Sequence, residues 1–146
     1  LWFNAHFVEV EGDIETGKVT ILRYVAVQDS GRIINPEVCE NQISGGIMMG
    51  CGFALAENII FDEKTGEVLN NSLVDYKILK TLDMPDPESR FVEVVDPVGP
   101  FGVKAIGEGT ICPAPAAVAQ AIYNATGMRL SVPITPEKLL SALKAK

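Results

Sequence analysis

The 146-residue sequence predicts an α+β fold in which antiparallel β-hairpins form a sheet packed with about three helices. Two observations support this prediction. Alternating and β-branched residues flank short turns that contain glycine, which is typical of paired strands. Three other segments carry proline in what would be the first turn of a helix. The length corresponds to one ordinary globular domain.

The clearest hairpin prediction covers residues 7–27. Alternating apolar and acidic residues lead to a turn that ends at Gly17, and a run of β-branched and aromatic residues follows. A similar pattern predicts a second hairpin at 57–69, around a turn that ends at Gly66. We expect a further strand at 90–95.

Three helices are predicted from their start and stop signals. Asn35 is a capping residue followed by proline and an acid, so a helix should begin there and cover residues 36–57. An alanine-rich helix is expected at 113–126, with Gly127 as its C-terminal stop. The third helix should follow the cap at Thr135 and run to the C-terminus.

The charge balance restricts the classes of partner. Twelve basic and nineteen acidic side chains give a net charge of −7 and a pI near 4.7. This excludes a general nucleic-acid or anionic-membrane surface, which needs clustered Lys and Arg. No apolar run reaches the roughly 18 residues of a membrane span, and no leader is visible at the start of the sequence. We therefore expect a cytoplasmic protein.

The cysteines and the histidine argue against a metal site built from them. Cys39, Cys51 and Cys112 form no C-x-x-C pair, so an all-cysteine zinc or iron–sulfur site is not expected. We interpret them as small buried hydrophobic residues in a reducing compartment. His6 is the single histidine, which excludes a multi-histidine metal site. No metal ligand is therefore assigned in this chain.

Glycines crowd the centre of the first predicted helix. Gly45, Gly46, Gly50 and Gly52 fall within eight positions, and each costs about 1 kcal/mol relative to alanine in a helix interior. Such a helix normally recovers this stability through close approach to another backbone or to a bound group. Tight packing of the helix and a position beside a ligand are both open interpretations.

A glycine-rich segment before the alanine-rich helix combines one basic and one acidic residue, Lys104 and Glu108. Glycines expose backbone N–H groups to a ligand, and a following helix N-terminus favours anions. From the residues alone, Glu108 is either a capping carboxylate or a catalytic group. Lys104 is either the partner of a neighbouring acid or a ligand contact.

These segments together resemble the xanthine dehydrogenase/aldehyde oxidase family of molybdenum hydroxylases. GVKAIGEG at 102–109 is similar to the family's C-terminal signature, and DSGRIINP at 29–36 resembles its D-x-G-x-x-[IL]-N-P motif. Residues 41–57 resemble its glycine-rich helix, and 125–137 resemble its closing helix–strand–helix. The resemblance covers almost the whole chain, in order and in spacing.

The resemblance implies roles for individual residues. Glu108 would be the active-site base, which takes a proton from the hydroxyl that attacks an electron-poor carbon. Gln42 would contact the pterin cofactor from the glycine-rich helix. The backbone loop against the cofactor would consist of Lys104, Ala105, Ile106 and Gly107. Asn41 and Ser44 depart from the family's usual glycine and glutamate but do not affect the expected base.

The resemblance also implies an assembly. Residues 1–146 would be a C-terminal fragment of the molybdopterin-binding domain in an oxidoreductase that hydroxylates an aldehyde or N-heterocycle, with water as oxygen source. The expected partners are the remainder of the molybdopterin subunit, subunits or domains that carry 2Fe-2S clusters and FAD, and a small-molecule substrate. We expect apolar surface on the chain to favour such contacts or a homo-oligomer.

Two alternatives stay open. The chain could be a noncatalytic split-subunit or fragment scaffold that completes the molybdenum site of a partner, or a free-standing domain that binds a small molecule. Whether the chain is a fragment of the oxidoreductase or a noncatalytic scaffold, it should be catalytically inactive in isolation. A single glutamate without the rest of a pocket cannot turn over substrate.

Overall fold

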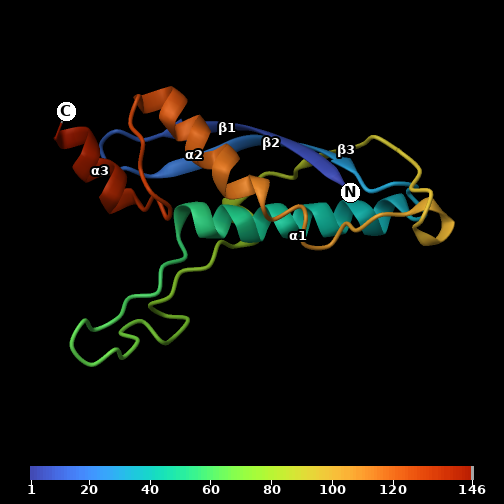
Figure 1. The fold of residues 1–146 in the computed structure, drawn as a ribbon. Helices are drawn as coiled ribbons and strands as arrows, with labels where there is room; N and C mark the ends of the chain where they lie inside the picture. Colours follow the sequence, from blue (N-terminus) through green and yellow to red (C-terminus); the bar gives the residue numbers. More distant parts are fainter. Residues whose placement is uncertain (146) are drawn as a thin grey trace.

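The computed structural model describes residues 1–145, which form one small sheet and three α-helices (Figure 1). The strands pair in the order β1-β2-β3. Short 3₁₀ turns lie at Thr81–Asp83 and Pro100–Gly102. The strands and α-helices are β1 (Phe3–Gly12), β2 (Val19–Asp29), α1 (Pro36–Leu55), β3 (Glu88–Phe91), α2 (Pro113–Thr126) and α3 (Pro136–Lys144).

The first predicted hairpin is confirmed by the antiparallel pair β1–β2. Its turn is closed by Asp13, whose carboxylate accepts a hydrogen bond from the backbone N–H of Glu15 at 2.8 Å. Gly17 ends the turn with φ of +75°, and a Cβ there would lie 2.1 Å from the carbonyl oxygen of Pro136. A side chain at this position would therefore separate the hairpin from the start of α3.

The predicted α+β class with three helices is confirmed, but the sheet is mixed and not antiparallel throughout. β3 runs parallel to β2, with Val25 opposite Glu88, and it covers 88–91 instead of the predicted 90–95. Between these strands the chain passes through α1 and a long loop, so it returns to the sheet in the same direction. Parallel neighbours need a crossover of this kind.

The second predicted hairpin, at 57–69, is reduced to one isolated bridge between Phe61 and Val68. Its turn forms as expected, because the Asp62 carboxylate accepts hydrogen bonds from Lys64 and Thr65. The segment extends away from the helices and the sheet (the green loop of Figure 1). Without a third strand or a packed face, a two-stranded ribbon gains little from longer pairing.

The predicted helix starts and the Gly127 stop are confirmed. Asn35 caps α1 by accepting a hydrogen bond from the N–H of Val38 at 3.2 Å, and Thr135 caps α3 in the same way. α2 ends at Gly127, which adopts the left-handed conformation with φ of +73°. α1 ends at Leu55, two residues before the predicted boundary.

α1 and α2 lie on one side of the sheet and enclose the core with it (Figure 1). The fully buried core side chains include Tyr24, Ile43, Ile47, Cys51, Val118 and Ile122. The expectation of three buried cysteines is correct for Cys51, only partly met by the half-buried Cys39, and wrong for Cys112, which is exposed at the start of α2. No helix within residues 1–145 has both the length and the apolar character needed to cross a bilayer.

A histidine–tyrosine pair lies between β1 and β2. The Nδ1 atom of His6 is 2.9 Å from the hydroxyl oxygen of Tyr24, and the two rings meet edge to face. The other ring nitrogen of His6 is buried and has no hydrogen-bond partner within residues 1–145. Burial lowers the pKa of His6 to about 4, because a charged imidazolium loses its hydration here.

This pair predicts a loss of stability in mild acid. The unfolded chain protonates His6 near its ordinary pKa of 6.5, whereas the folded chain resists protonation until about pH 4. The free energy of unfolding is therefore highest above pH 6.5 and decreases as the pH falls towards 4. Urea unfolding from pH 7 to pH 4 should show this loss, and His6→Gln should flatten the profile. An equal slope in the variant would contradict the assignment.

Candidate functional site

The glycine-rich segment before α2 is hydrogen-bonded to the residues that directly follow β2. The backbone N–H of Lys104 donates to the carbonyl of Ser30 at 2.8 Å, and the N–H of Arg32 donates to the carbonyl of Gly102 at 2.9 Å. Gly31 has φ of +70°, and a Cβ there would lie 2.4 Å from the oxygen of Gly102. Glycine at this position is therefore required for the two segments to meet.

A buried ion pair also joins the glycine-rich segment to the end of β2. The ammonium of Lys104 lies 2.6 Å from Oδ2 of Asp29, and the two side chains are only 10% and 9% exposed. Oδ1 of Asp29 also accepts a hydrogen bond from the N–H of Gly31 at 3.0 Å. The hydrogen bond from Lys104, followed by that from Gly31, holds the pKa of Asp29 below its usual range. Of the two interpretations of Lys104, the ion pair is observed.

The fold brings two of the predicted cofactor segments together. Gln42 lies on α1, and a Cβ placed on Gly107 would be 4.0 Å from its amide oxygen Oε1. The Gln42 amide is exposed and makes no hydrogen bond with any other residue in 1–145. Ala105 and Gly107 are exposed, and Ile106 is partly buried. An unpaired amide and an exposed loop backbone therefore lie beside each other.

A pocket of about 230 Å³ adjoins this loop at the start of α1. Lys104, Ile106, Asn35 and Cys39 are among the residues that line it. Ser30 also lines the pocket, and its buried hydroxyl oxygen has no hydrogen-bond partner within the described residues. An unsatisfied buried hydroxyl is costly, so a polar group beside it would be stabilising.

Glu108 follows Gly107 in a turn and has an exposed side chain. It does not cap α2, because the cap position belongs to Cys112 and carries no side-chain hydrogen bond. The Glu108 carboxylate makes no hydrogen bond or ion pair with another residue in 1–145. Its carboxylate is thus free to accept a proton or a hydrogen bond from a ligand.

The turn beyond Glu108 is held by the N-terminal strand. Asn4 donates its side-chain amide to the carbonyl of Gly109 at 2.6 Å. A Cβ on Gly109 would lie 2.8 Å from the indole ring of Trp2, so glycine allows the turn to close against this ring. Neither Asn4 nor Trp2 was predicted as part of the site, because both lie more than 100 positions away in the sequence.

The glycines of α1 divide between packing and open space. A Cβ on Gly46 would lie 1.8 Å from the hydroxyl of Thr110, and one on Gly50 would lie 2.6 Å from the Cβ of Ala114. These two glycines let α1 approach the start of α2 closely. Gly45 is exposed, with nothing within 4 Å of an added Cβ, and it lies one helical turn from Gln42. Both interpretations of the glycine-rich helix therefore have residues that fit them.

Comparison with known proteins identifies the family. The family model described as "Molybdopterin cofactor-binding domain" matches residues 1–85. The chain belongs to this family. The chain is 44% identical over 138 residues to the putative xanthine dehydrogenase molybdenum-binding subunit XdhA of Escherichia coli K12. It is 40% identical over 143 residues to the aldehyde oxidoreductase molybdenum-binding subunit PaoC of the same strain.

A solved structure supports the same family assignment. The chain superimposes on quinoline 2-oxidoreductase from Pseudomonas putida 86 with a TM-score of 0.88 and 37% identity, over 94% of this chain and 18% of that one. The two Escherichia coli relatives are matched over 94% and 97% of this chain and over 18% and 20% of their own length. The chain therefore spans about one fifth of each of these relatives.

The described residues fit a pterin cofactor. A pterin presents several hydrogen-bond donors and acceptors along its edges, and the unpaired amide of Gln42 and the backbone of the loop offer matching groups. Gly107 places no side chain between the loop backbone and this amide. Within residues 1–145, no three His, Cys, Asp or Glu side chains are grouped so that they could hold a metal ion.

The division among the glycines predicts opposite effects on stability. Gly46→Ala should lower the free energy of unfolding by about 1–3 kcal/mol, because its Cβ collides with Thr110. Gly45→Ala, one position earlier in the same helix, should raise it by up to about 1 kcal/mol. Urea unfolding of both variants measures the difference. Equal effects would contradict the assigned packing.

Proposed function

We propose that this chain forms part of a molybdenum-cofactor oxidoreductase that hydroxylates an aldehyde or an N-heterocycle, with water as the oxygen source. In this proposal, residues 1–146 are a C-terminal fragment of the molybdopterin-binding domain. Glu108 is the general base. Gln42 and the backbone of Lys104, Ala105, Ile106 and Gly107 contact the cofactor.

The observation that carries the proposal is the juxtaposition of Gln42 with Gly107. Sixty-five positions separate these residues in the sequence, yet the fold places the Gln42 amide oxygen 4.0 Å from where a Cβ on Gly107 would lie. Family membership independently supports a molybdopterin ligand for this chain. Relatives named as molybdenum-binding subunits of a xanthine dehydrogenase and an aldehyde oxidoreductase support the reaction class.

The chain's own residues would contribute binding and proton transfer. The Gln42 amide would donate to and accept from the cofactor edge, and the loop backbone would hold the opposite side. When bound, the cofactor would supply the two-electron oxidation of the substrate carbon. Glu108 would accept the proton of the attacking oxygen on its carboxylate. Because no residue in 1–145 pairs with that carboxylate, it can approach a ligand without breaking an existing contact.

Other subunits or domains would complete the enzyme. The remainder of the molybdopterin subunit would complete the pocket, and 2Fe-2S clusters and FAD on other domains or subunits would accept the electrons. Relatives are named as subunits, including the gamma subunit of the 6-hydroxypseudooxynicotine dehydrogenase complex from Paenarthrobacter nicotinovorans. This naming supports a multi-subunit assembly with a small-molecule substrate.

Replacement of the base tests the catalytic role. In the assembled full-length enzyme, Glu108→Gln should lower kcat by roughly 10²–10⁴-fold, because the amide cannot accept the proton. Molybdenum content should stay at the wild-type level. Glu63→Gln, in an exposed turn, is the matched control and should leave kcat unchanged. Full turnover by Glu108→Gln with cofactor bound would refute the assignment.

Replacement of the amide tests cofactor binding. Gln42→Leu keeps a similar volume but removes the donor and the acceptor, a loss of about 1.5 kcal/mol or roughly tenfold in cofactor affinity. Molybdenum bound per protein, measured by elemental analysis after dilution, should fall accordingly. Gln120→Leu, on an exposed position of α2, is the control. Equal retention in both variants would contradict a Gln42 contact.

A further inference from the structure

We propose that Asp29 is a positioning residue for the cofactor loop, and that Lys104 serves the site through its backbone while its charge binds Asp29. This inference rests on the proposed function, because the loop is assigned to the cofactor there. It assigns a role to the aspartate at the end of β2, far from the loop in sequence.

The ion pair occupies the polar atoms of both side chains. Oδ2 of Asp29 lies 2.6 Å from the Lys104 ammonium, and Oδ1 accepts the N–H of Gly31. With about one tenth of each side chain exposed, the ammonium cannot turn towards a ligand without leaving a buried carboxylate unpaired. Separating such a pair is strongly unfavourable. The Lys104 charge is therefore bound to Asp29 and is not free to bind a ligand.

The loop of residues 104–109 is held by polar contacts at both of its ends. At one end Lys104 is bound by Asp29 and by the carbonyl of Ser30. At the other end Gly109 is bound by Asn4. Residues 105–106 make no hydrogen bond with any other described residue. The two anchors and the packing of Ile106 against the core set the position of this stretch, and Asp29 is the charged part of the first anchor.

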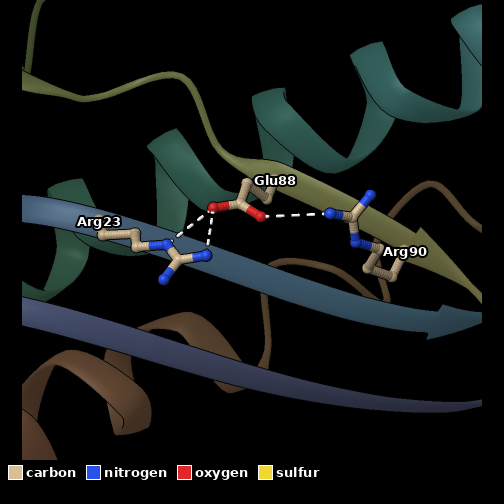
Figure 2. A network of polar contacts seen from close by, with 3 residues as sticks. All are labelled: Arg23, Glu88 and Arg90. Atoms are coloured by element: carbon tan, nitrogen blue, oxygen red, sulfur yellow. Dashed lines mark hydrogen bonds and ion pairs between the residues drawn. The ribbon is translucent and has the colours of Figure 1, made fainter.

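A second ion pair provides a matched control (Figure 2). Arg23 lies 2.6 Å from Glu88, the same distance as in the Asp29–Lys104 pair, and Glu88 also contacts Arg90. In the closer pair, the side chains of Arg23 and Glu88 are 61% and 38% exposed, and they join β2 to β3. Exposed pairs contribute little to stability. Glu88→Gln therefore removes a similar contact without disturbing the loop.

Hydrogen–deuterium exchange of the full-length protein tests the inference directly. Asp29→Asn should accelerate exchange in peptides covering residues 104–109 by about tenfold or more, because the first anchor is weakened. Glu88→Gln should leave these peptides unchanged. In the assembled enzyme, Asp29→Asn should lower kcat on the order of tenfold with substrate KM little changed, because the loop is displaced relative to the reacting groups.

The double variant Asp29→Asn/Lys104→Met separates positioning from stability. It leaves no unpaired buried charge, so the thermal midpoint should return towards wild type. Loop exchange should stay fast, because the anchor is still absent. Unchanged loop exchange in Asp29→Asn, or recovery of protection together with the thermal midpoint in the double variant, would overturn the inference. Failure of the proposed function would instead appear as wild-type protein without molybdenum.

Discussion

The close contact between α1 and the start of α2 is the constraint on which the site depends. Thr110 is fully buried against Gly46, and Ala114 meets the helix at Gly50. Only a hydrogen atom at those glycines lets the two segments approach so closely. This contact fixes the segment before α2 along α1, and it thereby places Gly107 opposite Gln42. The cost of glycine in a helix interior is offset by this packing.

The electrostatics of the loop follow from the same geometry. In a chain with a net charge of −7, the Asp29–Lys104 ion pair is the one within residues 1–145 whose side chains are both largely buried. It lies where the glycine-rich segment meets β2. Glu108, four residues later, stays unpaired and exposed. Lys104 is thus bound in an ion pair that joins two segments, whereas the Glu108 carboxylate is free to contact a ligand.

Local signals predicted the helices and the first hairpin well. Asn35 and Thr135 cap helices because a side-chain oxygen and a following proline act within one turn of the chain. The parallel pairing of β3 and the loss of the 57–69 hairpin were not predictable in this way. Strand direction depends on the path through α1, and extended pairing depends on a neighbouring strand that residues 57–69 do not find.

The sequence by itself determined the segments that make the site: the glycine-rich helix, the loop of Lys104 to Glu108, and their resemblance to a family. Only the tertiary structure decided how these residues are used. The partner of Lys104 lies 75 positions away, and the amide beside Gly107 lies on another element. Motif spacing records which residue types are present, whereas burial and long-range contact decide which polar groups are paired and which remain free.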